Sequence, residues 1–70
     1  MFRNNDIYIK DNILYLREPR VRIPFQYIKT VLVENYKLKD KITITATTGH
    51  QYHMLTEIKE TIEIIKLLTK

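Results

Sequence analysis

The alternation of apolar and hydroxyl side chains over residues 41–48 constrains the fold of this chain more than any other feature. Isoleucine or alanine stands at every second position, at Ile42, Ile44 and Ala46, and threonine stands between them. Successive side chains of a strand point to opposite faces, so the pattern predicts a strand with one buried and one solvent-facing side. The whole chain has eleven isoleucines, three valines and eight threonines but a single alanine. This β-branched composition favours sheet through most of the sequence.

A hairpin is predicted near the N-terminus. The segments 6–10 and 13–17 flank Asp11 and Asn12, a residue pair that tolerates the positive φ angles of a two-residue turn. Such a turn places Tyr8 beside Tyr15 on one face of the hairpin. The full register that it predicts pairs Lys10 with Ile13, Ile9 with Leu14, Tyr8 with Tyr15 and Ile7 with Leu16.

Two prolines and one glycine divide the middle of the chain. Pro19 interrupts the second strand, and Pro24 is expected to begin a single helical turn over residues 24–28. Gly49 supplies the left-handed residue of a turn after the alternating strand. Further strands are expected at 21–23, 29–36 and 51–54, a charged loop at 37–41, and core positions at Tyr27 and Tyr52. Apolar residues on both sides of the 29–36 strand indicate that it is covered on two faces or lies at an oligomer contact.

The C-terminal segment 56–69 is predicted to form an amphipathic helix. Ile58, Ile62 and Ile65 recur at the spacing of one helix face, and charged side chains lie on the opposite face. Thr56 is a suitable N-cap residue. The stripe is widened by Leu55, Ile64 and Leu68, and its central residue, Ile62, is expected to be fully buried.

These elements predict an α+β fold in a single domain, residues 1–70. The strand-rich region 6–54 is expected to form a curved antiparallel sheet of about five strands, with the helix of residues 56–69 packed on it. A domain of 70 residues buries only about 60% of its unfolded surface, and the chain has no cysteine for a disulfide. Such small domains are commonly stabilised by a partner chain. We therefore expect a homodimer, with Leu67 or the face of Val31 and Val33 in the contact.

The composition argues against an enzyme. The chain contains neither cysteine nor serine, so the commonest nucleophiles are absent. Its single glycine excludes a glycine-rich phosphate loop. His50 and His53 are three residues apart, and on a strand they point to opposite faces, which does not suit one metal ion. We predict no catalytic residues, no cofactor and no metal site.

Positive charge is concentrated in two segments. Residues 55–70 hold three lysines and three glutamates, so the formal net charge of +4 belongs to residues 1–54. Cations beside exposed tyrosines are the groups that single-stranded nucleic acid binding requires. The simpler interpretation is a basic surface that keeps a small protein soluble. The candidate partner-binding residues are Tyr8, Tyr15, Arg17, Arg20, Arg22, Lys37, Lys39 and Lys41.

The segment 21–31, followed by residues 42–45, Gly49, Tyr52 and the closing helix, resembles the small bacterial pleckstrin-homology-like domains over roughly residues 13–70. Those domains show an extended segment of the form rIPy–xx–I–xx–V, a hairpin of the form ITIxT–xxGxxYxM, and a C-terminal helix that plugs the open end of a barrel. A full pleckstrin-homology fold has seven strands, so a count of about five implies an incomplete barrel or one that a second copy completes. The resemblance implies a binding module without chemistry of its own.

The sequence thus favours a small non-enzymatic module that binds a protein partner through a sheet edge or its first hairpin, as a regulator or inhibitor of that partner. The alternative is a basic single-stranded nucleic-acid-binding protein that uses Arg17, Arg20, Arg22, Tyr8 and Tyr15. A small-molecule pocket between helix and sheet stays open as a third interpretation. No apolar run approaches the ~20 residues of a membrane span, and we expect a cytoplasmic protein. The small size alone raises the hypothesis of a phage-encoded inhibitor.

Overall fold

The chain folds into short strands followed by a helix. The computed structural model describes residues 2–4 and 6–69. Over these residues, the strands are β1 (Phe2–Arg3), β2 (Ile7–Lys10), β3 (Ile13–Leu16), β4 (Val21–Pro24), β5 (Ile28–Tyr36), β6 (Lys39–Ala46) and β7 (Gln51–Thr56). A 3-10 turn (Phe25–Tyr27) joins β4 to β5, and α1 (Ile58–Leu68) comes last. The expected α+β class and C-terminal helix are confirmed.

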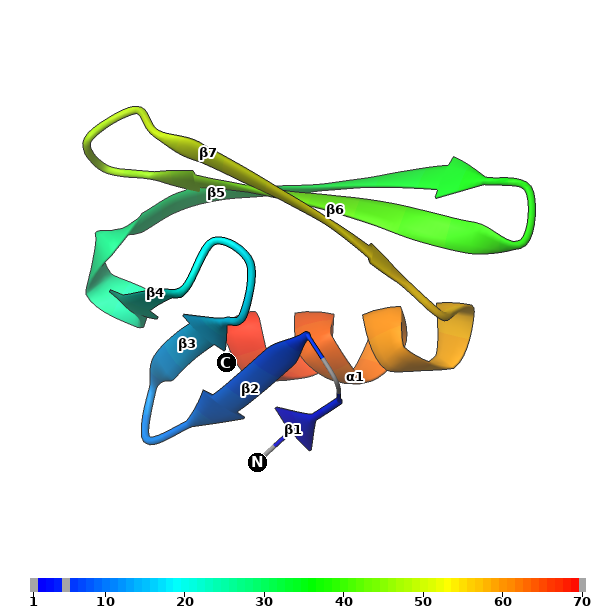
Figure 1. The fold of residues 1–70 in the computed structure, drawn as a ribbon, viewed down its shortest axis with the longest axis horizontal. Coiled ribbons are helices and arrows are strands. Elements are labelled where there is room, and N and C mark those ends of the chain that lie inside the picture. The colour runs from blue at the N-terminus through cyan, green and yellow to red at the C-terminus, as the bar shows by residue number, and fades with distance from the viewer. Residues whose placement is uncertain (1, 5, 70) are drawn as a thin grey trace.

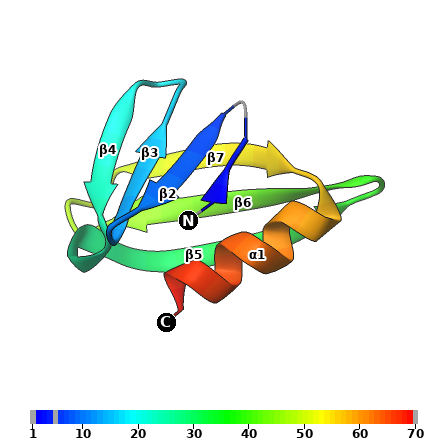
Figure 2. The same ribbon diagram turned by 90° about the horizontal axis from the view of Figure 1, so that it is seen from below.

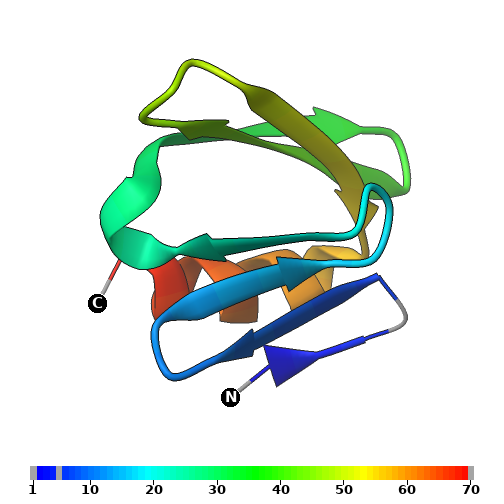
Figure 3. The same ribbon diagram turned by 60° about the vertical axis from the view of Figure 1, so that its left-hand side comes forward.

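The strands form two antiparallel sheets that face each other (Figures 1 and 3). Their strand orders are β1-β2-β3-β4 and β5-β6-β7. Within the described part of the chain this gives seven strands in two sheets, where we expected about five in one sheet. α1 contacts β1 and β6 at one side of the two layers (Figure 2). The core between the layers consists of Phe2, Ile7, Ile9, Leu14, Leu16, Ile23, Ile42, Ile44 and Ile64.

The hairpin of β2 and β3 forms as predicted. Asp11 and Asn12 make the turn with φ angles of 55° and 60°. The register is confirmed at all four residue pairs, so Tyr8 lies opposite Tyr15. Turn chemistry and the alternation of the two strands point to the same register here, because both depend only on residues close in sequence.

The turn provides a test of this local geometry. Replacing Asn12 with valine is expected to lower the free energy of unfolding by about 1–2 kcal/mol, because a β-branched side chain is strained at positive φ. Chemical denaturation would measure the change. Lys10→Val is the matched control, since it places the same side chain at an exposed strand position beside the turn. Equal destabilisation by both variants would contradict the assigned turn.

β6 is the central strand of the second sheet, and it shows the alternation that the sequence predicts. Ile42 and Ile44 are fully buried between the layers. The opposite face is less exposed than expected, because Thr43 is buried and its hydroxyl lies 3.0 Å from Nδ1 of His53 on β7. Gly49 makes the following turn at a φ of 92°, as predicted.

The helix begins one residue later than the N-cap prediction. Thr56 is the last residue of β7, and its buried hydroxyl is hydrogen-bonded to the hydroxyl of Thr61. The N-cap is Glu57, whose side chain accepts the backbone N–H of Glu60. The Glu60 carboxylate in turn accepts the N–H of Glu57 at 3.0 Å. This reciprocal pair forms a capping box, and the expectation of Thr56 as the N-cap is wrong.

The helix also buries a different face from the one expected. Ile62 was expected at the centre of the buried stripe, but its side chain is 57% exposed, whereas Ile64 is 1% exposed. These residues lie about 160° apart round the helix axis. The bond between Thr56 and Thr61 explains the rotation, because it fixes Thr61 on the inward face next to Ile64. Leu67, one of the two candidates for the dimer contact, packs against the core of its own chain.

The turn after β4 forms at the expected place. Pro24 stands immediately before the 3-10 turn, in which Phe25 packs against the core. Tyr27 was predicted to be a core residue, but half of its surface is exposed. The reason is that one tight turn at a corner directs Phe25 inward and leaves Tyr27 outside. Tyr52 is half-buried against the core, in line with its predicted position.

Candidate binding surfaces

Four side chains form a row across the outer face of the β1–β4 sheet. Arg3 pairs with Tyr8, Tyr8 with Tyr15, and Tyr15 with Arg22. Partners in antiparallel strands have their side chains on the same face. The adjacent row faces the core and consists of Phe2, Ile9, Leu14 and Ile23. The outer row, which we call the Arg-Tyr-Tyr-Arg row, therefore has a cation on each edge strand and two rings on the central strands.

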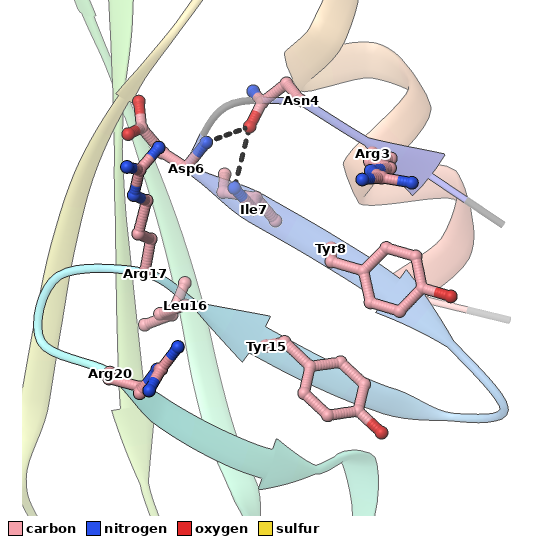
Figure 4. A pocket seen from close by; sticks show the side chains of 9 residues that line it. All are labelled: Arg3, Asn4, Asp6, Ile7, Tyr8, Tyr15, Leu16, Arg17 and Arg20. Carbon is pink, nitrogen blue, oxygen red and sulfur yellow. Dashed lines mark hydrogen bonds between the residues drawn. The ribbon is translucent and has the colours of Figure 1, made fainter.

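The two tyrosine rings pack against each other. Their centroids are 5.3 Å apart and their planes are tilted by 45°. The guanidinium carbon of Arg3 lies 5.9 Å from the centroid of the Tyr8 ring, within the range of a cation–π contact. Figure 4 shows both rings extending from the sheet in the same direction with their hydroxyl groups outermost. The rings are half-buried, so part of their surface is open to a ligand.

An open groove of about 610 Å³ runs along one end of this row (Figure 4). It is lined by Arg3, Asn4, Asp6, Ile7, Tyr8, Tyr15, Leu16, Arg17 and Arg20. The Asn4 side chain shapes its rim, because Oδ1 accepts the backbone N–H groups of Asp6 at 2.8 Å and Ile7 at 2.7 Å. Three arginines and one carboxylate line the groove, so it has a net positive charge.

The fold brings five of the eight candidate residues to this face. Arg17 and Arg20 line the groove, and the backbone N–H of Arg17 donates to the carbonyl of Asp6 at 3.0 Å. Arg20 and Tyr15 also line an adjoining hollow of about 370 Å³ together with Arg22. The sequence prediction lacked Arg3, because a two-residue strand has too few positions to show an alternating pattern.

The three candidate lysines lie elsewhere, on the hairpin of β5 and β6. Residues 37–41 were expected to form a charged loop, but β6 begins at Lys39. Only residues 37–38 form the turn, with Lys37 at a φ of 51°. Lys41 places Nζ 5.9 Å from the ring centroid of Tyr36. Lys39 lines a hollow of about 240 Å³ together with the acidic residues Asp6, Glu57 and Glu60. The lysines therefore do not extend the basic face of the β1–β4 sheet.

A second candidate surface is the free edge of β5. This nine-residue strand pairs with β6 along one side, and no strand of the described residues pairs with its other side. Leu32 is 55% exposed and Val33 is 40% exposed, and Tyr36 is exposed as well. A long, apolar and unpaired edge strand is a template on which another chain can add a strand.

The helix has exposed apolar side chains as well. The hairpin of β5 and β6 projects beyond the rest of the molecule (Figure 1). Ile58 and Ile62 of α1 are exposed, although isoleucine is usually buried. We define the β5 surface as the free edge of β5 with Leu32, Val33 and Tyr36.

Each of the two histidines contacts a neighbouring side chain. The His50 ring packs against that of Tyr52 with a centroid distance of 4.6 Å and an interplanar angle of 46°, and His53 is hydrogen-bonded to Thr43. Among residues 2–4 and 6–69 there is no group of three or more histidine and acidic side chains arranged to hold a metal ion. The same residues include no helix of the length and apolarity that a bilayer crossing requires.

Comparison of the chain with protein-family models, with curated proteins and with solved structures found no match in any of the three.

Proposed function

We propose that this chain is a small non-enzymatic protein-binding module, and that its β5 surface accepts an extended segment of a partner protein as an added strand. The observation that carries the proposal is the nine-residue free edge of β5 with exposed Leu32 and Val33. Proteins normally protect such an edge with lysine, proline, a bulge or a covering element. The pairing of β5 with β6 is irregular only at the start of β5, between Ile28 and Thr30, so residues 30–36 of this edge are regular.

The added strand gains both backbone and side-chain contacts. Backbone hydrogen bonds supply affinity in this binding mode, and the pockets for alternate side chains supply specificity. On β5, Leu32 and Val33 point to opposite faces of the sheet. A partner segment with apolar residues on both faces suits this surface.

A second copy of the chain supplies such a segment when no other partner is present. Antiparallel pairing of two β5 strands about Leu32 places Leu32 opposite its own counterpart and Val31 opposite Val33. Glu34 then faces Thr30, so that no like charges meet across the pair. This arrangement gives a homodimer with an isologous contact and accounts for the small core of each chain.

The module is further proposed to be a compact relative of the pleckstrin-homology-like domains. Seven strands followed by a C-terminal helix is the composition that this resemblance implies, which supports the proposal. Two facing sheets of four and three strands, with α1 in contact with β1 and β6, also support the proposal, because an incomplete barrel with a C-terminal helix has these parts. A cytoplasmic location and a role as regulator or inhibitor of the partner belong to the same proposal.

Affinity capture from a nuclease-treated lysate of the source organism tests the proposal. Affinity-tagged wild-type chain is compared with Leu32→Lys, which places a charge at the free edge, and with Gln51→Lys, which adds the same charge on β7 at the other edge. We expect wild type and Gln51→Lys to capture the same protein in equal amounts. Leu32→Lys should capture at least ten-fold less of that protein. Binding of that protein in purified form, with the same order of variants, completes the test. Equal capture by all three baits would contradict a role for the β5 edge.

A further inference from the structure

The Arg-Tyr-Tyr-Arg row has the chemistry of a second binding site, on a different sheet from the β5 surface. Its cations stand on the two edge strands, and its rings stand on the two central strands. Adjacent strands are about 4.8 Å apart, so the row spans roughly 14 Å across the sheet. We propose that this face binds single-stranded nucleic acid, with bases stacked on Tyr8 and Tyr15 and phosphates held by the surrounding arginines.

Two properties of the face favour this ligand over other anions. Aromatic rings on neighbouring strands of an exposed sheet are the platform on which single-stranded bases stack, and arginine contributes through both charge and stacking. The groove beside the rings is lined by Arg3, Arg17 and Arg20 against one carboxylate, that of Asp6. A polyanion without bases would use only the cations, and a duplex keeps its bases away from the rings.

Neither ring is required to fill the core. The adjacent row of core side chains already closes the inner face of the sheet beneath Tyr8 and Tyr15. The rings contact each other, Arg3 lies over the Tyr8 ring, and part of the surface of both rings is open. Substitutions in the row can therefore be made without creating a cavity in the core.

Fluorescence anisotropy with labelled fifteen-nucleotide probes, dT15 and rU15, tests the site at several salt concentrations. We expect both probes to bind wild type with micromolar or tighter affinity at low salt, and more tightly than a duplex of the same length. Replacing Arg3 and Arg22 with glutamine should flatten the salt dependence by about 0.7 in log–log slope for each lost phosphate contact. The control pair Lys59→Gln and Lys66→Gln removes the same charge from exposed positions of α1 and should leave the slope unchanged.

The tyrosines distinguish base stacking from simple charge attraction. Tyr8→Leu and Tyr15→Leu should each weaken binding roughly 5- to 150-fold, whereas Tyr8→Phe and Tyr15→Phe keep the ring and should bind like wild type. Circular dichroism identifies any leucine variant that fails to fold. In that case the corresponding alanine variant is used instead, and it should also bind more weakly than wild type. The proposal is overturned by absent wild-type binding at low salt, by leucine variants that bind as wild type, or by an equal loss in the lysine control pair.

Discussion

The Ile64→Ala variant is expected to lose about 2–5 kcal/mol of its free energy of unfolding. Ile64 is 1% exposed and belongs to the core between the two sheets. Domains have roughly 0.05–0.15 kcal/mol of stability per residue, or about 4–10 kcal/mol for a chain of this length. Loss of one buried isoleucine therefore removes a large fraction of the total. Thermal and urea unfolding, followed by circular dichroism, measure the effect.

Ile62→Ala is the matched control on the same helix. It deletes the same atoms from a side chain that is mostly exposed, so the free energy of unfolding should change by no more than about 0.5 kcal/mol. Alanine also has a higher helix propensity than isoleucine, which offsets part of any loss. A larger loss in Ile62→Ala than in Ile64→Ala would show that the helix packs through the face predicted by the isoleucine spacing.

The second large effect concerns assembly. At concentrations of tens of micromolar, light scattering should give wild-type protein twice the chain mass of 8.5 kDa. Leu32→Lys should reduce the mass to that of one chain, because two lysines would meet at the centre of the paired β5 strands. Gln51→Lys should stay dimeric, since β7 is at the other edge of the sheet. Wild type at 8.5 kDa across a hundred-fold concentration range would contradict the dimer.

The features predicted correctly from the sequence are those fixed by local interactions. The register of β2 and β3 follows from the turn at Asp11 and Asn12 and from alternation within ten residues. The burial of Ile42 and Ile44 follows in the same way. Both are decided by side-chain period and turn conformation, which the sequence contains directly.

The helix face was not predictable from the same information. Ile62 and Ile64 are both apolar and lie about 160° apart round α1, so their spacing alone does not determine which of them points inward. The choice is made by the hydroxyl contact between Thr56 and Thr61, which links the end of β7 to the first turn of the helix. Threonine is a polar residue in any periodicity analysis, so its burial at this joint has no signal in the sequence.

The candidate site was predicted only in part, because some of its residues are brought together by the tertiary fold rather than by one hairpin. Tyr8 and Tyr15 were paired correctly because they lie in one hairpin, and Arg22 joins them through the next strand. Arg3 was missed, because β1 exists only through its pairing with β2. The lysines of the β5–β6 hairpin were grouped with the arginines by charge alone, and the two-sheet architecture places them on another sheet.

Hydrogen–deuterium exchange of the wild-type chain at low and high protein concentration tests the β5 proposal most directly. β5 and β7 are both edge strands of the same sheet, so their peptides have comparable exposure in an isolated chain. Addition of a strand from another chain protects only the edge that it covers. The account predicts that residues 28–36 become protected as the concentration rises, while residues 51–56 exchange unchanged. Equal protection of both segments, or exchange of 28–36 that does not depend on concentration, would contradict the β5 edge as the site of strand addition.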